Sequence, residues 1–184
     1  MKPIPLHIET PIWPSQPLSD ALGTPVLMKM DTFQPVGSFK MRGIGHLCQI
    51  KCMEGAAALV SSSGGNAGYA AAYSGRKLGV PVTVVVPAST PEWMRGLVRR
   101  EKATVIEHGA SWAYAHAHAL ELVEAFDAAS KAIELNPDNG QYYYNMGDAM
   151  ELLDMNQQAC INWTRAKDLG YNVPPEKMGV CEEN

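Results

Sequence analysis

Apolar and polar positions follow two kinds of pattern in the first half of the chain. Short apolar runs rich in β-branched residues predict strands, and amphipathic or alanine-rich stretches predict helices. The predicted strands span residues 24–30, 56–60, 82–87 and 103–107. The predicted helices span residues 40–52, 66–78 and 91–102. Short connections between alternating strands and helices imply right-handed βαβ units, and hence a parallel sheet of three or four strands covered by helices.

The pattern changes after residue 111, where the strand-like runs end. Helical positions then repeat at a spacing of 34, the period of helix–turn–helix solenoid repeats. The equivalent pairs are Ala125 and Ala159, Lys131 and Arg165, Ala132 and Ala166, and Leu135 and Leu169. Trp163 falls on the predicted inner face, between two alanines. The C-terminal third of the chain is therefore predicted to be all-helical.

These patterns predict an α/β domain at residues 1–124, helical repeats at 125–171 and a flexible tail at 172–184. Because residues 111–135 contain no strong helix breaker, the boundary near 124 is predicted to lie inside one continuous helix. The tail carries two adjacent prolines and acidic residues, which favour a frayed end.

Composition narrows the class of protein. The net charge is −4, which argues against nucleic acid or an anionic membrane as the main partner. No apolar run reaches the length of a membrane span, and the N-terminus lacks the apolar run of a secretory signal, so we expect a cytoplasmic protein. The four cysteines fit neither a zinc spacing nor a dense disulfide framework, and Cys48 and Cys52 are predicted to be buried free thiols.

Two motifs carry candidate chemistry. Residues 37–43 (GSFKMRG) place Lys40 at the mouth of a predicted helix, and residues 61–68 (SSSGGNAG) form a polar turn between a strand and a helix. Together they provide an amine that can form a Schiff base and backbone N–H groups that can hold a carboxylate. This pairing suits chemistry on amino acids. The alternatives are a solvated lysine in a first helical turn and a tight structural turn.

Other polar clusters are explained without a ligand. His116 and His118 are two residues apart on a helix and point in different directions, so no metal site is predicted. The basic residues of segment 91–102 are interpreted as a solvated helix face rather than a phosphate or nucleic-acid patch.

The two motifs, in this order and spacing, resemble those of the fold-type-II pyridoxal-phosphate enzymes, specifically the L-serine/L-threonine ammonia-lyases (dehydratases). The resemblance covers roughly residues 1–124. Further matching stretches are residues 6–11, 29–31, 34–36, 70–73, 78–81 and 103–105. Cysteine and threonine synthases also belong to fold type II, but Arg42 and Gly43 favour the dehydratases.

The resemblance implies a role for each motif residue and an activity. Lys40 would form the Schiff base with pyridoxal 5'-phosphate, Phe39 would stack on its ring, and Asn66 would hydrogen-bond its ring hydroxyl oxygen. The residues that would bind the substrate carboxylate are Ser63, Gly64, Gly65 and Ala67. The reaction would be β-elimination and deamination of serine or threonine to a 2-oxoacid. A buried lysine would suit this chemistry, because burial favours the neutral amine that attacks an aldehyde.

Residues 125–171 resemble tetratricopeptide repeats, comprising the second helix of one repeat and both helices of the next. Tyr171 stands where the repeat usually has proline, so the array is predicted to end there. This resemblance implies a protein or peptide partner.

The sequence also departs from the dehydratase pattern. The chain has no run of three or four glycines after residue 110, where that family's phosphate-binding loop would lie, and most of its larger domain is missing. Three hypotheses stay open: a pyridoxal-phosphate lyase, a non-catalytic interaction module, and a chimeric or truncated product. Sheet edges left open by the missing domain favour a homodimer or aggregation.

Overall fold

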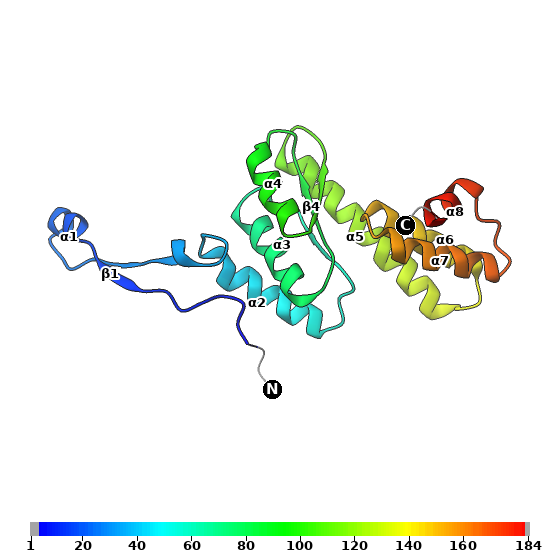
Figure 1. Ribbon diagram of the computed structural model, residues 1–184, viewed down its shortest axis with the longest axis horizontal. Coiled ribbons are helices and arrows are strands. Elements are labelled where there is room, and N and C mark those ends of the chain that lie inside the picture. The colour runs from blue at the N-terminus through cyan, green and yellow to red at the C-terminus, as the bar shows by residue number, and fades with distance from the viewer. Residues whose placement is uncertain (1–3, 183–184) are drawn as a thin grey trace. The chain divides into compact units, whose positions relative to one another are not determined.

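The computed structural model describes residues 4–182, with the side chain of residue 182 excepted, and the chain forms two compact units (Figure 1). Unit 1 comprises the residues up to Val84 together with Thr90–Ala103, and unit 2 comprises Val85–Ser89 and the residues from Thr104 onward. The division passes through a strand.

Unit 1 holds the predicted alternation of strands and helices. Its elements are β1 (Ile12–Pro14), α1 (Gln16–Leu22), β2 (Leu27–Lys29), a 3₁₀ turn (Asp31–Phe33), α2 (Lys40–Met53), β3 (Leu59–Ser61), α3 (Asn66–Leu78), the first part of β4 (Val82–Val86) and α4 (Glu92–Arg100). The predicted bounds of α3 are confirmed, because Gly79 adopts a left-handed φ of 71° and ends the helix there.

The parallel sheet has three strands among the described residues, in the order β3-β4-β5, where β5 spans Thr104–Glu107. Leu59 of β3 pairs with Val82 of β4 in a parallel register. Every residue of β4 is buried, as the apolar run at 82–87 predicts for a central strand. The predicted α/β class with a parallel sheet flanked by helices is therefore confirmed.

The predicted strand at 24–30 lies outside that sheet. Its observed part, β2, pairs antiparallel with β1, and helix α1 connects the two strands. Neither β1 nor α1 was predicted from the sequence. For β1 the reason is that a three-residue strand ending in proline gives almost no period-2 signal. This hairpin region leaves several large apolar side chains exposed: Ile12, Trp13, Leu18, Leu22, Leu27 and Phe33.

An ion pair fastens the base of this hairpin to helix α2. Arg42 donates to both carboxylate oxygens of Asp31, from Nη2 at 2.8 Å and from Nε at 3.0 Å. The Thr10 hydroxyl donates to the same carboxylate at 2.7 Å. Nearby, Gln34 exchanges two side-chain hydrogen bonds with the backbone of Ile8. These contacts fix the entry of the chain into α2.

We expect the protein to lose stability in acid as the Asp31 carboxylate is protonated. Hydrogen bonds from Arg42 and Thr10 lower its pKa well below the ordinary value. The unfolded chain binds this proton at a pKa of about 3.9, so the contribution is complete above that pH and is lost as the pH falls toward the folded-state pKa. Asp31→Asn should remove the contribution at neutral pH and flatten the acid dependence of the midpoint of thermal unfolding.

The control for this measurement is Asp20→Asn. The Asp20 carboxylate accepts a hydrogen bond from Gln16 on the exposed surface of α1. Thermal unfolding followed from about pH 7 to about pH 2 should separate the two variants. Equal acid profiles for Asp31→Asn and the unmodified chain would show that the ion pair does not stabilise this region.

Unit 2 is helical after β5. Its helices are α5 (Trp112–Leu135), α6 (Gly140–Leu152), α7 (Asn156–Asp168) and α8 (Pro175–Glu182). Helix α5 runs unbroken through residue 124, so the predicted continuous helix is present, whereas the domain boundary near 124 stays a prediction. The core of this unit is formed by Ala159, Trp163, Ala166 and Val173.

Two features of unit 2 differ from the sequence predictions. Helix α8 lies within the segment predicted to be a flexible tail, and its first residue is the second of two prolines. Proline is favoured in a first helical turn, where its missing N–H costs nothing, so the pair starts a helix rather than preventing one. In addition, Cys160 and Cys181 form a disulfide. Cys48 and Cys52 are free as predicted, but only Cys48 is buried.

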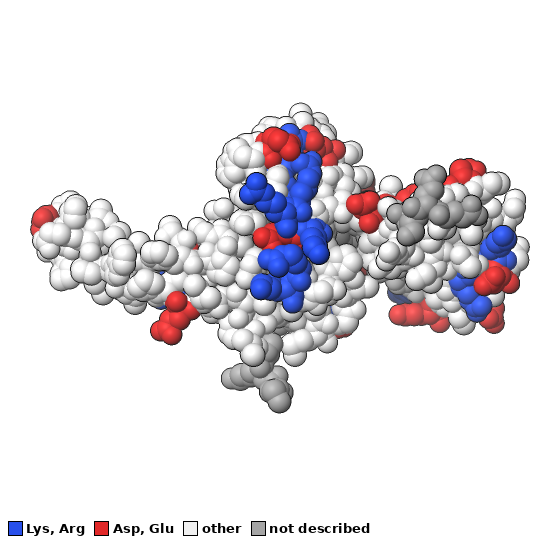
Figure 2. All heavy atoms as spheres, viewed as in Figure 1, with Lys and Arg blue, Asp and Glu red and all other residues white. Residues whose placement is uncertain are grey.

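The surface charges of unit 1 gather on its helices. Figure 2 shows lysine and arginine side chains over α3 and α4, with acidic side chains among them. Arg99 and Arg95 both pair with Glu92, and Arg76 pairs with Glu101. These pairs fit the interpretation of a solvated helix face. Within residues 4–182, no helix is long and apolar enough to cross a membrane.

Candidate functional site

The segment before α2 places Lys40 at the start of the helix. Gly37 adopts a left-handed φ of 67°, which glycine accepts without strain. Ser38 is buried, and its hydroxyl oxygen accepts a hydrogen bond from the backbone N–H of Lys40 at 3.3 Å. Met41 is fully buried. The helix therefore begins at Lys40 with a fixed orientation.

The lysine itself is exposed, whereas the sequence analysis favoured a buried amine. Its Nζ lies over the ring of Phe39, 5.0 Å from the ring centroid, and Phe39 is 61% exposed. The reason is the helical period: Met41 and Gly45, one turn apart, form the buried face of α2, which leaves Lys40 on the outer side. The amine and the aromatic ring thus form an open surface.

The serine-rich turn connects β3 to α3. Gly65 is the N-cap residue of α3, and its backbone is extended. Because glycine has no side chain, no side-chain hydrogen bond caps the helix. The Gly65 N–H donates to the hydroxyl oxygen of Ser63 at 3.4 Å, and a Cβ placed on Gly65 would meet no atom within 4 Å. The first backbone N–H groups of a helix point outward and favour anions. The turn therefore presents an open helix N-terminus, with Asn66 exposed beside it.

Two glycines of this turn are required by close packing. A Cβ on Gly68 would lie 1.9 Å from the backbone oxygen of Ser63, and a Cβ on Gly64 would lie 2.4 Å from the hydroxyl oxygen of Thr90. Real Cβ contacts are not this short, so a side chain at position 68 would displace the backbone of the turn, and one at position 64 would displace the Thr90 side chain. The shape of the turn depends on these two residues.

The two motifs belong to one folded unit. Helices α2 and α3 pack side by side, and Met41 from the lysine motif shares a core cluster with Ala70 of α3. Val36 completes this cluster, and Tyr69 and Tyr73 pack against it. The helix that begins at Lys40 and the helix that begins at Asn66 are therefore held against each other by a common core.

The basic residue that follows Lys40 most closely in the sequence is Arg42, and it already forms an ion pair. Arg42 pairs with Asp31, and this hydrogen bond raises the pKa of the guanidinium. This pair was not predicted, although opposite charges at positions 31 and 42, both within stretches that match the family, were a usable signal. Within the described part of the chain, no group of three or more His, Cys, Asp or Glu residues could hold a metal ion.

The family profile described as "Pyridoxal-phosphate dependent enzyme" matches residues 4–161. The chain belongs to this pyridoxal-phosphate-dependent enzyme family. The match includes both motifs and also most of the segment predicted to form tetratricopeptide repeats, so the repeat assignment and the idea of a fusion stay predictions.

Related family members share much of the sequence. The human protein "L-serine dehydratase/L-threonine deaminase" is 48% identical over 134 residues, which cover 72% of this chain and 38% of the human protein. Human "Serine dehydratase-like" is 48% identical over 120 residues, which cover 65% of this chain and 36% of that protein. The chain is thus a partial serine-dehydratase-like domain, spanning about two fifths of the relatives' length.

A solved structure of the family agrees. The "fungal L-serine ammonia-lyase from Rhizomucor miehei" superposes with a TM-score of 0.58 at 26% identity, covering 83% of this chain and 58% of the fungal one.

Membership of this family implies pyridoxal phosphate as the cofactor. Lys40, Phe39 and the N-terminus of α3 fit the aldehyde, the ring and the substrate carboxylate, but not the phosphate. The Lys40 amine is accessible to an aldehyde and lies beside an aromatic face that suits the ring, although it lacks the burial expected from the sequence, and the open N-terminus of α3 suits a carboxylate. The phosphate would need further donors, because Arg42 is occupied by Asp31. The residues therefore suit covalent attachment of the cofactor and binding of a substrate carboxylate better than they suit binding of the phosphate.

Proposed function

We propose that this chain attaches pyridoxal phosphate through Lys40 and receives a small hydroxy-amino acid, serine or threonine, at the turn of residues 63–67. One observation carries the proposal. An exposed amine with an adjacent aromatic ring and an uncapped helix N-terminus are held in one unit by the shared core of Met41 and Ala70. The names of the related proteins support serine and threonine as the substrate class.

Each motif residue has a proposed task. The amine of Lys40 carries the covalent link and moves the proton at the substrate α-carbon, and Phe39 covers one ring face. Asn66 donates to the ring hydroxyl oxygen. The substrate carboxylate lies against the Ser63 hydroxyl and the backbone N–H groups of Gly64, Gly65 and Ala67, where the helix dipole also favours an anion. When bound, the cofactor supplies an electron sink that stabilises negative charge at the α-carbon.

The proposed reaction removes the β-hydroxyl and then ammonia, giving a 2-oxoacid. Because Arg42 is engaged by Asp31, we expect weak affinity for the cofactor phosphate. Charge-assisted hydrogen bonds to phosphate supply much of such affinity. Covalent attachment at Lys40 is therefore a more direct test than turnover.

The test is covalent labelling of Lys40. The protein is mixed with pyridoxal phosphate, reduced with borohydride and digested, and the peptide that contains Lys40 is weighed by mass spectrometry. We expect a label on this peptide that a serine or threonine excess alters, and its loss in Lys40→Ala.

The matched control is Lys51→Ala. Lys51 lies on the same helix, is exposed and pairs with Glu54. This variant should keep the label on Lys40. Equal labelling of all exposed lysines, with no preference for Lys40, would contradict the proposal.

A second candidate is the non-catalytic interaction module. A groove of about 380 Å³ runs between α5 and α6, and this specific feature favours it. The groove is lined by Ala125, Ala128, Ala129, Ala132, Tyr142, Asn145, Asp148, Ala149 and Leu152. Small residues on α5 leave space there that an extended peptide can fill. A chain without any selective label on Lys40 would favour this candidate.

A further inference from the structure

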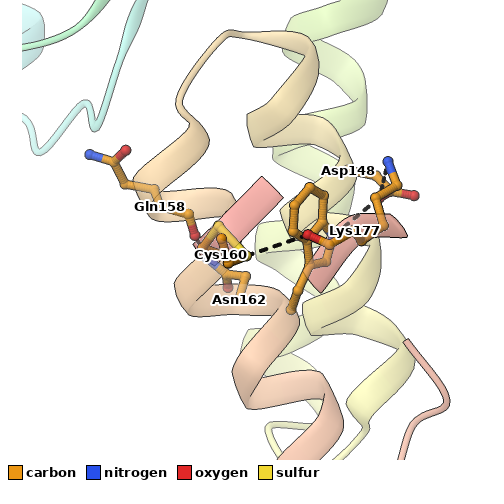
Figure 3. Close-up of a disulfide and its surroundings, with 7 residues drawn as sticks. Asp148, Gln158, Cys160, Asn162 and Lys177 are labelled. Atoms are coloured by element: carbon orange, nitrogen blue, oxygen red, sulfur yellow. Dashed lines mark hydrogen bonds and ion pairs between the residues drawn. A yellow bond between two sulfur atoms is a disulfide. The ribbon is translucent and has the colours of Figure 1, made fainter. Parts of the chain in front are cut away.

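Helix α8 lies beyond the family-matched segment, which ends at residue 161. The disulfide between Cys160 of α7 and Cys181 of α8 fastens the helix to unit 2, as the yellow bond in Figure 3 shows. The two cysteines are 21 residues apart in the sequence. The proposed lyase activity does not involve this part of the chain.

The noncovalent contacts of α8 centre on one lysine. Lys177 lies 3.2 Å from the Asp148 carboxylate and also pairs with Glu151, so the lysine contacts two carboxylates of α6 (Figure 3 shows it beside Asp148). Its Nζ lies 4.9 Å from the centroid of the buried Trp163 ring. Although partial burial opposes it, hydrogen bonding to Glu151 and Asp148 raises the pKa of Lys177.

Helix α8 depends on links to α6 and α7 to stay helical and docked. The helix has eight residues, and isolated helices of this length are unstable in water. Met178 and Cys181 supply its apolar contacts with the Trp163 cluster, and both are only partly buried. The ion pairs of Lys177 with Asp148 and Glu151 are only partly buried, and solvent screens part of their attraction. The covalent link is therefore the dominant restraint.

We propose that the Cys160–Cys181 disulfide is a redox-controlled latch that keeps α8 docked on helices α6 and α7. Opening requires a dithiol reductant. One thiolate of the dithiol attacks a cysteine sulfur and displaces the other cysteine as a thiolate, and the second thiol then closes the dithiol into its own disulfide. The protein gains two electrons and two protons as two thiols, and the dithiol loses them. Both cysteines are partly exposed, so a dithiol can reach them.

Reduction of the disulfide should affect the groove between α5 and α6 as well as helix α8. When α8 leaves, Lys177 withdraws from Asp148 and from the face of Trp163. Asp148 also lines the groove between α5 and α6, and Trp163 Nε1 donates to it at 3.2 Å. The reduced state thus leaves the groove with an acidic side chain that has lost its lysine partner.

Hydrogen exchange followed by mass spectrometry tests the proposal on the full chain. The protein is compared after oxidation with glutathione disulfide and after reduction with dithiothreitol. We expect amides of the α8 peptide to exchange at least about tenfold faster in the reduced protein, because removing the cross-link restores the freedom of the closed loop. Thiol titration of the denatured chain should rise from the two free cysteines, Cys48 and Cys52, to all four.

Two variants make the result specific. Cys181→Ser should show fast α8 exchange under both conditions, and Cys52→Ser, on α2 of unit 1, should keep the full redox response. Reduction of the unmodified protein gives the same information if Cys181→Ser fails to fold. Equal α8 exchange in the oxidised and reduced protein, or four titratable thiols after oxidation, would overturn the proposal.

Discussion

Replacing Trp163 with alanine is expected to lower the free energy of unfolding of unit 2 by about 3–5 kcal/mol. The Trp163 side chain is fully buried between Ala159 and Ala166 in the core of this unit. A Cβ on Gly147 would lie 2.4 Å from the indole, so α6 approaches the ring as closely as a glycine allows. The substitution therefore leaves a cavity that neighbouring helices cannot fill without moving. Urea denaturation followed by far-ultraviolet circular dichroism measures the loss.

Trp112→Ala is the matched control in the same unit. Trp112 is 56% exposed and stacks on the ring of His116 at the surface. Its removal should change the free energy of unfolding by less than about 0.5 kcal/mol beyond the lost stacking. Trp163→Phe separates packing from hydrogen bonding, because it keeps an aromatic ring and removes the bond to Asp148. Similar losses for Trp163→Ala and Trp112→Ala would show that the packing is not tight.

Gly68→Ala should destabilise unit 1 by about 1–3 kcal/mol or more and abolish selective labelling of Lys40. The new Cβ would lie 1.9 Å from the backbone oxygen of Ser63 and 3.0 Å from a methyl group of Val84. The Val84 side chain belongs to a fully buried strand, and the Ser63 oxygen belongs to the turn itself, so the turn must move. A displaced turn also changes the open N-terminus of α3.

The control for this substitution is Gly96→Ala in the middle of α4. A Cβ on Gly96 would meet no atom within 4 Å, so only helix propensity changes. We expect a gain of about 0.5–1 kcal/mol in the free energy of unfolding. Thermal and urea unfolding should show a lower free energy of unfolding for Gly68→Ala and a higher one for Gly96→Ala. A stability of Gly68→Ala equal to that of the unmodified chain would mean that the turn relaxes freely.

Local sequence signals were sufficient where neighbours along the chain decide the structure. The bounds of α3 follow from its alanine-rich period and from Gly79, and β4 follows from a run of β-branched residues. The order and spacing of the motifs around Lys40 and Ser63 were also sufficient to recognise the family. Their expected chemistry stays a prediction that labelling can test.

The tertiary structure decided the features that depend on residues far apart in the sequence. Lys40 is exposed because Met41 takes the buried position against Ala70, and β2 pairs with β1 rather than with the parallel sheet. Arg42 is engaged by Asp31, which removes it as a free phosphate ligand. The sequence alone thus determined the family and most of the elements, but not β1, α1 or α8. Exposure, ion pairing and the cysteine link between α7 and α8 were decided only in three dimensions, because periodicity records a residue's own helix or strand and not the partner packed against it.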